Sequence, residues 1–177
     1  MTDAIELSPA DPNWPAAFAA ERSRILPLFA VPPLLIEHMG STAIPGLPAK
    51  PVIDILVLVA DLQSGRAAIP ALEALGYSYW ADNPDQTKLF LVKGLPPAPR
   101  RTHHLHIYTD PDEVQRHLLF RNHLRSDTEA RDAYLALKQD LAARYRDDRE
   151  AYSNLKSAFV DEIVHSLGGP ERRVPRA

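Results

Sequence analysis

Residues 34–60 read LLIEHMGSTAIPGLPAKPVIDILVLVA, and this stretch decides the fold that the sequence predicts. Residues 34–38 predict a short strand. Residues 51–60 predict a second strand, nearly all apolar and rich in β-branched side chains. A loop with two glycines and two prolines separates them. Because residues 51–60 are apolar on both alternating faces, we expect this strand to be covered on both sides of a sheet.

The segments on either side extend this pair of strands to an α+β pattern. Upstream, Asp11-Pro12 indicates a helix start, and apolar residues at helical spacing predict a helix over residues 13–29. Downstream, the predicted elements in chain order are a helix over 64–75, strands over 77–80, 88–92 and 102–108, and helices over 112–126, 128–145 and 148–167. The sequence therefore predicts a small mixed sheet followed by a C-terminal three-helix region.

Length and composition restrict the classes of protein to which the chain could belong. Its 177 residues fit one domain, which we place at residues 1–168, with residues 169–177 as a flexible tail. The net charge of −3 argues against a general nucleic-acid binder. The absence of cysteine excludes disulfides, thiolate metal sites and a cysteine nucleophile. With neither a signal peptide nor an apolar run of about 20 residues, we expect a cytoplasmic protein that does not cross a membrane.

One acid and two histidines form the candidate metal site. Asp54 lies in the middle of the apolar strand, where a carboxylate must be paired, hydrogen-bonded or bound to a cation. His104 and His106 are two residues apart in a strand, so their side chains leave the same face. Such a ligand set suits Zn²⁺, Mn²⁺ or Fe²⁺ better than Mg²⁺. The alternatives are an Asp54 held by backbone amides or an arginine, and two partly exposed strand histidines.

Glycine, hydroxyl and basic residues next to these strands form a candidate phosphate site. Gly40-Ser41-Thr42 follows the first strand and could cradle a phosphate, although Gly-Ser turns are common and neither a P-loop nor a dinucleotide fingerprint is present. Basic side chains that could neutralise phosphates are Lys50, Lys88, Arg100 and Arg101, with Lys50 also a candidate catalytic residue. Solvated surface charge is the alternative for each of the four.

Three other groups of residues receive simpler interpretations. Glu37 and His38 end the first strand; Glu37 is a candidate fourth metal ligand, and a solvated strand end is expected for His38. The basic residues of the C-terminal helices are interpreted as surface i,i+4 pairs with acids, and they are Arg116, Arg121, Lys138, Arg144 and Lys156. Methionine and aromatic residues are interpreted as core.

The block EHMGSTAIPGLPAKPVID at residues 37–54 resembles the GrpB family, also called UPF0157. Further matching stretches are DPNWP at 11–15, RTHHLH at 101–106, FRNHLR at 120–125 and KSAF at 156–159, so the resemblance covers nearly the whole chain. It implies a nucleotidyltransferase-like fold. It also implies a link to dephospho-CoA kinase, because a domain of this family is fused to that enzyme in some organisms.

The resemblance also shows where this chain departs from the nucleotidyltransferase pattern. That pattern places Gly-Ser after the first strand and an Asp-x-Asp pair on the next. Gly40-Ser41 matches the first part and Asp54 matches one acid, but position 56 is Leu and position 52 is Val. A late-strand third acid is replaced by His104 or His106. Catalysis with two metal ions needs several carboxylates, so this departure favours one metal ion or a protein that only binds.

Three functions therefore compete. The first is metal-dependent nucleotidyl transfer from a nucleoside triphosphate to an unknown acceptor. The second is a non-catalytic module that binds a nucleotide, a CoA precursor or another phosphorylated small molecule and assists a partner enzyme. The third is a hydrolase whose water is activated by a divalent ion. For the two catalytic functions, the divalent ion would be Mn²⁺, Zn²⁺ or Mg²⁺.

Overall fold

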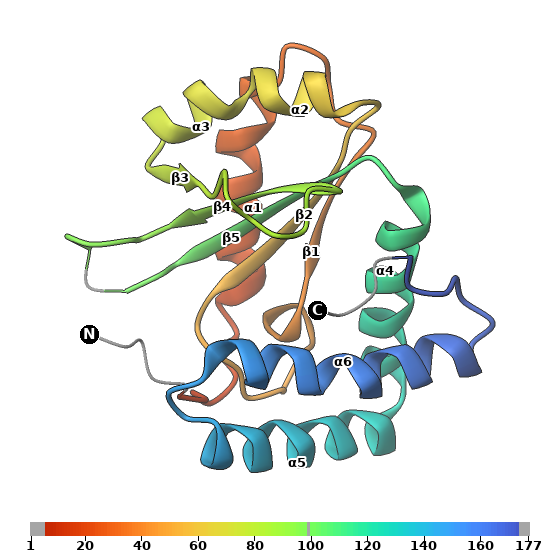
Figure 1. The fold of residues 1–177 in the computed structure, drawn as a ribbon. Helices are drawn as coiled ribbons and strands as arrows, with labels where there is room; N and C mark the ends of the chain where they lie inside the picture. Colours follow the sequence, from red (N-terminus) through yellow and green to blue (C-terminus); the bar gives the residue numbers. More distant parts are fainter. Residues whose placement is uncertain (1–5, 99, 174–177) are drawn as a thin grey trace.

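A five-stranded mixed sheet forms the centre of the molecule in the computed structural model, which describes residues 6–98 and 100–173 (Figure 1). The strands are β1 (Leu35–Met39), β2 (Ile53–Leu58), β3 (Tyr77–Tyr79), β4 (Lys88–Lys93) and β5 (His103–Tyr108). They are arranged in the order β1-β2-β5-β4-β3, with β2 and β5 parallel and the other pairs antiparallel. Each strand lies within a few residues of its predicted position.

The helices also follow the predicted pattern, with one difference. Their bounds are α1 (Trp14–Ile25), η1 (Leu26–Leu28), η2 (Ser41–Ala43), α2 (Leu62–Ala67), α3 (Ile69–Ala74), α4 (Pro111–Ser126), α5 (Thr128–Arg144) and α6 (Arg149–Ser166). The single helix predicted over 64–75 is wrong, since it is divided into α2 and α3. Pro70 stands at the first turn of α3, where its missing N–H costs nothing, so the helix restarts there.

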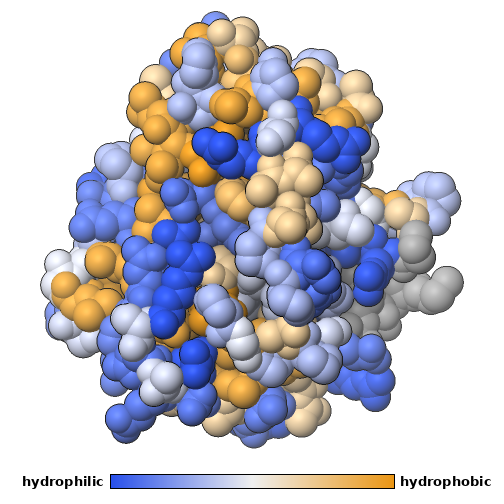
Figure 2. All heavy atoms as spheres, turned by 180° about the vertical axis from the view of Figure 1, so that it is seen from behind, coloured by the Kyte–Doolittle hydropathy of each residue, from blue (hydrophilic) through white to orange (hydrophobic). Residues whose placement is uncertain are grey.

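One face of the sheet carries the main hydrophobic core. The strands β2, β4 and β5 contribute apolar side chains that are almost fully buried, such as Ile55, Leu91 and Leu105. Helix α1 lies behind the sheet and α2 and α3 lie along its upper end in Figure 1, and residues of all three pack into this core. Seen from behind, the outer surface interleaves hydrophilic with apolar side chains (Figure 2). The core between the sheet and helices α1, α2 and α3 explains why apolar residues recur at regular spacing in the first half of the chain.

The other face is covered only in part by the C-terminal helices. Met39, Leu56 and Tyr108 pack against Val114 of α4. Helices α5 and α6 lie side by side below the sheet, near the loop between β1 and β2 (Figure 1). Strand β2 is therefore buried on both faces, as predicted. The rest of this sheet face is open and holds the predicted site residues.

The ends of the described chain are attached to the fold. Near the N-terminus, Ser8 pairs with Ala49 by two backbone hydrogen bonds of 2.9 and 3.0 Å. Near the C-terminus, Arg172 forms a 3.1 Å ion pair with Asp161. Of the predicted tail, residues 174–177 lie outside the described residues. Among the helices that the structure describes, none combines the length and apolar composition needed to cross a membrane.

Candidate functional site

The parallel register of β2 and β5 places the acid beside the two histidines. Asp54 lies opposite His104, and His106 is the next residue of β5 on that face. Asp54 Oδ1 lies 3.0 Å from His104 Nδ1 and 3.7 Å from His106 Nε2. One ligand atom from each residue falls within 4.8 Å of the other two. Neighbouring strands thus bring together three potential ligands of a single cation.

The protonation states of this cluster suit a cation. Burial alone would raise the pKa of Asp54, but the hydrogen bond to His104 and the interactions with the nearby imidazoles of His104 and His106 hold it well below its usual range. Burial lowers the pKa of His106 to about 4, so its imidazole is neutral at neutral pH, as metal binding requires. His104 Nε2 and both ring nitrogens of His106 are buried without a hydrogen-bond partner in the described chain. A bound cation would satisfy such nitrogens, so these residues fit one.

Gly40 brings the backbone of the predicted phosphate loop against the acid. Its φ of 72° lies in the left-handed region. A Cβ at this position would lie 2.4 Å from Asp54 Oδ2. Only glycine therefore meets both the conformation and the close approach to the carboxylate.

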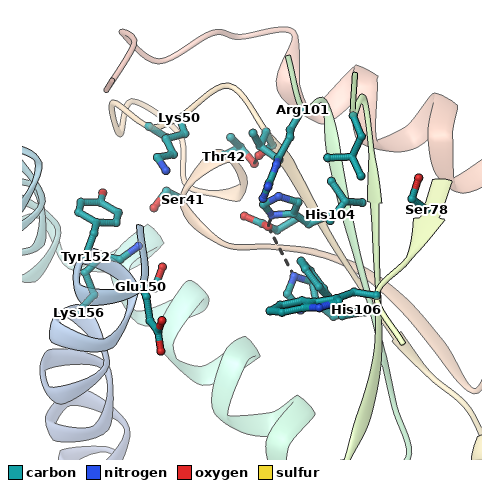
Figure 3. Close-up of a pocket in the computed structure, with 18 of the residues that line it drawn as sticks. Ser41, Thr42, Lys50, Ser78, Arg101, His104, His106, Glu150, Tyr152 and Lys156 are labelled. Carbon is teal, nitrogen blue, oxygen red and sulfur yellow. Dashed lines mark hydrogen bonds and ion pairs between the residues drawn. The ribbon is translucent and has the colours of Figure 1, made fainter. Parts of the chain in front are cut away.

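A cavity of about 890 Å³ opens over the cluster (Figure 3). The predicted residues that line it are Ser41, Thr42, Lys50, Asp54, Arg101, His104 and His106. Thr42 contributes through a hydroxyl that is already engaged, since it donates to Val52 O at 3.2 Å and contacts His38 Nε2 at 2.9 Å. In the close-up, Tyr152 and Lys156 of α6 lie on one side of the cavity, and His104 and His106 lie across from them on the sheet. The fold therefore gathers most of the predicted site around one hollow.

The remaining predicted site residues lie elsewhere. Glu37, expected as a fourth ligand, is outside the metal cluster because its Oε2 accepts from Arg121 at 2.7 Å. Lys88 pairs with Asp85 at 3.0 Å and lines a separate cavity of about 70 Å³. Arg100 is exposed and does not line the main cavity. The structure does not bring these three residues to the metal cluster. They lie next to the site elements in sequence, but the tertiary fold decides which groups a long charged side chain contacts.

Two expectations for polar residues near β1 are corrected by burial. His38 is not solvated; its side chain lies under α1, where it stacks on Phe18 with ring centroids 4.9 Å apart. Burial lowers its pKa to about 4. Arg121 does not form a surface helix pair. It is buried, and besides Glu37 it donates to His38 O at 2.7 Å.

The cavity's second wall comes from α5 and α6. Lys156 begins the KSAF stretch that matches the family, whereas no quoted motif contains Lys138. Lys138 is fully buried and donates to Pro48 O, and Lys156 lies 4.1 Å from the ring centroid of Tyr152. Lys50 approaches the same ring at 5.3 Å. Burial, and for Lys138 the charge of Lys156, lowers the pKa of Lys138 to about 7 and that of Lys156 to about 8. We call Lys50, Lys138 and Lys156 the cationic wall.

The opposite side of the cavity is apolar. Its residues are Tyr79, Trp80, Pro84, Phe90, Val92 and Leu95, which we call the aromatic wall. Trp80 is 48% exposed and meets Phe90 edge-on at 6.1 Å, and Phe90 lies 4.7 Å from His106, both measured between ring centroids. The interpretation of aromatic residues as core is therefore wrong for Trp80. The signal was the position of Trp80 at the end of a strand, just before the polar turn through Asn83-Pro84-Asp85.

The sequence matches a family described as GrpB protein over residues 4–166. Among its relatives, the UPF0157 protein PA4798 of Pseudomonas aeruginosa is 46% identical over 163 residues, covering 92% of this chain and 67% of that protein. The UPF0157 protein BH1888 of Halalkalibacterium halodurans is 37% identical, covering 90% and 80%. A dephospho-CoA kinase of Mycolicibacterium paratuberculosis is 33% identical over 88% of this chain, which spans only 44% of that enzyme.

Two solved structures show the same fold. The Cid1 poly(U) polymerase, in a structure with MgGTP bound, has a TM-score of 0.54 and 18% identity, covering 78% of this chain and 45% of that one. This likeness shows that the fold is nucleotidyltransferase-like. The conserved protein GrpB from Enterococcus faecalis has a TM-score of 0.81 and 31% identity, covering 92% of this chain and 99% of that one. Together with the match over residues 4–166, this shows that the chain belongs to the GrpB family.

Proposed function

We propose that this protein binds a nucleoside triphosphate together with one divalent cation and transfers the nucleotidyl group to a hydroxyl acceptor. One observation carries the proposal: the Asp54–His104–His106 cluster lies in a single cavity beside the cationic wall. A cation site next to lysines suits a ligand that carries several phosphates.

The chain's own residues would divide the work as follows. Lys50, Lys138 and Lys156 would hold the β- and γ-phosphates, and the hydroxyl of Ser41 would contact them at the mouth of the β1–β2 loop. The α-phosphate would then lie over the cluster. The acceptor oxygen bonds to the α-phosphorus, the bond from that phosphorus to pyrophosphate breaks, and the hydroxyl proton is released to water.

Asp54, His104 and His106 would hold the cation. When bound, it supplies positive charge to the reacting phosphate. One carboxylate with two imidazoles favours Mn²⁺, Zn²⁺ or Fe²⁺ over Mg²⁺.

A binding module without catalysis is the second candidate, and Leu56 favours it. This residue stands on the same sheet face as Asp54, at the place of the second acid, and is fully buried against α4. A second cation therefore has no carboxylate there. Such a module would bind nucleotide or a CoA precursor beside a partner such as dephospho-CoA kinase and release no pyrophosphate.

Calorimetry on metal-free protein tests the proposal. Mn²⁺ and Zn²⁺ are titrated into the wild type and into His104→Ala/His106→Ala, with and without ATP. We expect the wild type to bind one equivalent of metal tightly and ATP to increase the affinity. In the double variant the metal affinity should be at least about tenfold weaker, because the loss of even an outer-shell partner of a metal weakens binding by about that factor. Glu37→Gln is the matched control and should bind metal like the wild type, since Arg121 already holds that carboxylate.

A second measurement decides between transfer and binding alone. Pyrophosphate release is followed with each nucleoside triphosphate, with Mn²⁺, Zn²⁺ or Mg²⁺ and a panel of alcohols as acceptors. Release that disappears in Asp54→Ala supports transfer. Tight ATP binding that survives Asp54→Ala, with no release under any condition, would replace transfer with the binding module.

A further inference from the structure

The residues of the aromatic wall do not contribute to the proposed binding of phosphates. These six residues carry no formal charge, and Trp80 is among the few large apolar side chains that the described chain leaves exposed. An exposed tryptophan on the wall of a cavity is typical of a binding surface, because its large ring gains contact area at low entropic cost.

The position of Trp80 is fixed by the fold. Its backbone N–H donates to Phe90 O at 3.0 Å, which extends the pairing of β3 and β4 by one residue. Its carbonyl accepts from Asn83 N at 3.3 Å, and Asn83 is buried. The indole therefore stands on a turn whose backbone is anchored at both ends.

The two walls lie on opposite sides of the metal cluster. Across the sheet, the order β2-β5-β4-β3 leads from Asp54 through the histidines to Phe90 and then to Trp80. The cationic wall comes from the other direction, from the β1–β2 loop, α5 and α6. In Figure 3, Lys50 and Lys156 lie on one side of His106, and Ser78 of β3, the strand that precedes Trp80, lies on the other.

The geometry of displacement at phosphorus relates the separation of the two walls to the positions of the acceptor and the leaving group. In a displacement at phosphorus, the attacking and leaving oxygens lie roughly in line. If pyrophosphate leaves toward the cationic wall, the acceptor approaches from the opposite side, which is the aromatic wall. This step rests on the proposed function.

We infer that the aromatic wall is an acceptor subsite, and that the acceptor is a small alcohol whose apolar or aromatic group packs on Trp80 and Phe90. Its hydroxyl oxygen forms the bond to the α-phosphorus, the bond to pyrophosphate breaks, and the hydroxyl proton passes to water.

Fluorine NMR on protein labelled with 5-fluorotryptophan tests the subsite directly. The chain has two tryptophans, and Trp14 is buried in the core, so it serves as an internal control for folding. The Trp80 signal is assigned by its loss in Trp80→Leu. Benzyl alcohol is the acceptor probe, adenosine the nucleobase probe, and ATP with Zn²⁺ the nucleotide probe.

We expect benzyl alcohol to shift the Trp80 signal and leave the Trp14 signal unchanged, with or without saturating ATP and Zn²⁺. Trp80→Leu should weaken benzyl alcohol binding about tenfold, the order found when a stacking ring is removed. Leu34→Ala is the control, since this side chain is 67% exposed and does not line the cavity. It should change nothing.

Two results would overturn the inference. If adenosine shifts Trp80, or if ATP displaces benzyl alcohol, Trp80 is a nucleobase platform. If no probe shifts Trp80, the wall is not a subsite. If benzyl alcohol shifts the Trp80 signal but calorimetry detects no binding of ATP or Zn²⁺, the proposed function is refuted. The aromatic wall would then still be a binding surface for an apolar group of some other ligand.

Discussion

At the scale of single residues, the site depends on a close contact between the backbone of the β1–β2 loop and the Asp54 carboxylate. Gly40 is the clearest case, since it combines a positive φ with the contact to Asp54. Asp54 in turn stays ionised because two imidazoles lie beside it. The loop and the acid therefore act as one unit.

Gly40→Ala should weaken metal binding as well as lower stability. The new Cβ meets Asp54 Oδ2, so the carboxylate must move from the cluster. Gly46→Ala is the matched control, because Gly46 has a similar φ of 77° and a Cβ added there would meet no atom within 4 Å. Measured in urea, Gly46→Ala should lose roughly 1–2 kcal/mol of unfolding free energy from backbone strain. Gly40→Ala should lose more, because a φ of 72° with a ψ of −171° is a conformation that is essentially open to glycine alone. Only Gly40→Ala should weaken Zn²⁺ binding; equal metal affinities in the two variants would contradict a role for the close approach.

At the scale of elements, α5 and α6 form one wall of the cavity that lies over the open face of the sheet. Each begins with an aspartate whose side chain accepts a first-turn N–H, from Ala130 for Asp127 and from Ala151 for Asp148. These caps fix where the helices start and so which of their residues face the sheet. Lys138 and Lys156 thereby lose most of their hydration.

Binding of inorganic triphosphate should weaken as pH rises from about 6 to 9. Lys138, with a pKa of about 7, and Lys156, with a pKa of about 8, are charged below this window and neutral above it. Triphosphate itself becomes more negative as pH rises, which alone would strengthen its binding. A weaker affinity at high pH therefore indicates that the lysines have lost their charge. Calorimetry on metal-free protein should show a loss of about tenfold or more, the worth of one hydrogen bond to a charged group.

The matched variant for this measurement is Lys156→Met, which should bind triphosphate more weakly than the wild type at pH 6 and approach it at pH 9. An affinity that does not change with pH would show that the two lysines do not contact the anion. The same pKa values make the ligand-free fold more stable as pH rises from 7 toward 10, because the unfolded lysines then hold protons that the folded ones have released.

At the scale of the whole molecule, a second core joins the helical layer to the β1–β2 loop. Ile44 and Leu47 of the loop pack with Leu124 of α4 and Tyr134 of α5. Tyr134 also stacks with Phe159 of α6, with ring centroids 5.5 Å apart. This core sets the distance between the cationic wall and the metal cluster.

Leu124→Ala should therefore cost about 2–5 kcal/mol of unfolding free energy, as is usual for a fully buried leucine. It should also weaken triphosphate binding, because the helices and the loop lose a shared contact. Urea denaturation and calorimetry measure the two effects. Leu155→Ala on α6 is the control: this side chain is 44% exposed and should cost less than about 0.5 kcal/mol. Similar losses for both would contradict the second core.

The sequence by itself determined the order of the elements and, to within a few residues, the bounds of most of them. It also determined the face shared by His104 and His106, and the family. Local spacing decides the elements and the shared face, because strand alternation, helical period and proline act over a few residues. Only the tertiary structure decided that Asp54 lies against His104, that Glu37 belongs to Arg121, and that Lys138, Lys156 and Trp80 line the cavity. The first two contacts join residues 50 and 84 positions apart. They depend on strand order and helix packing, which no local pattern contains.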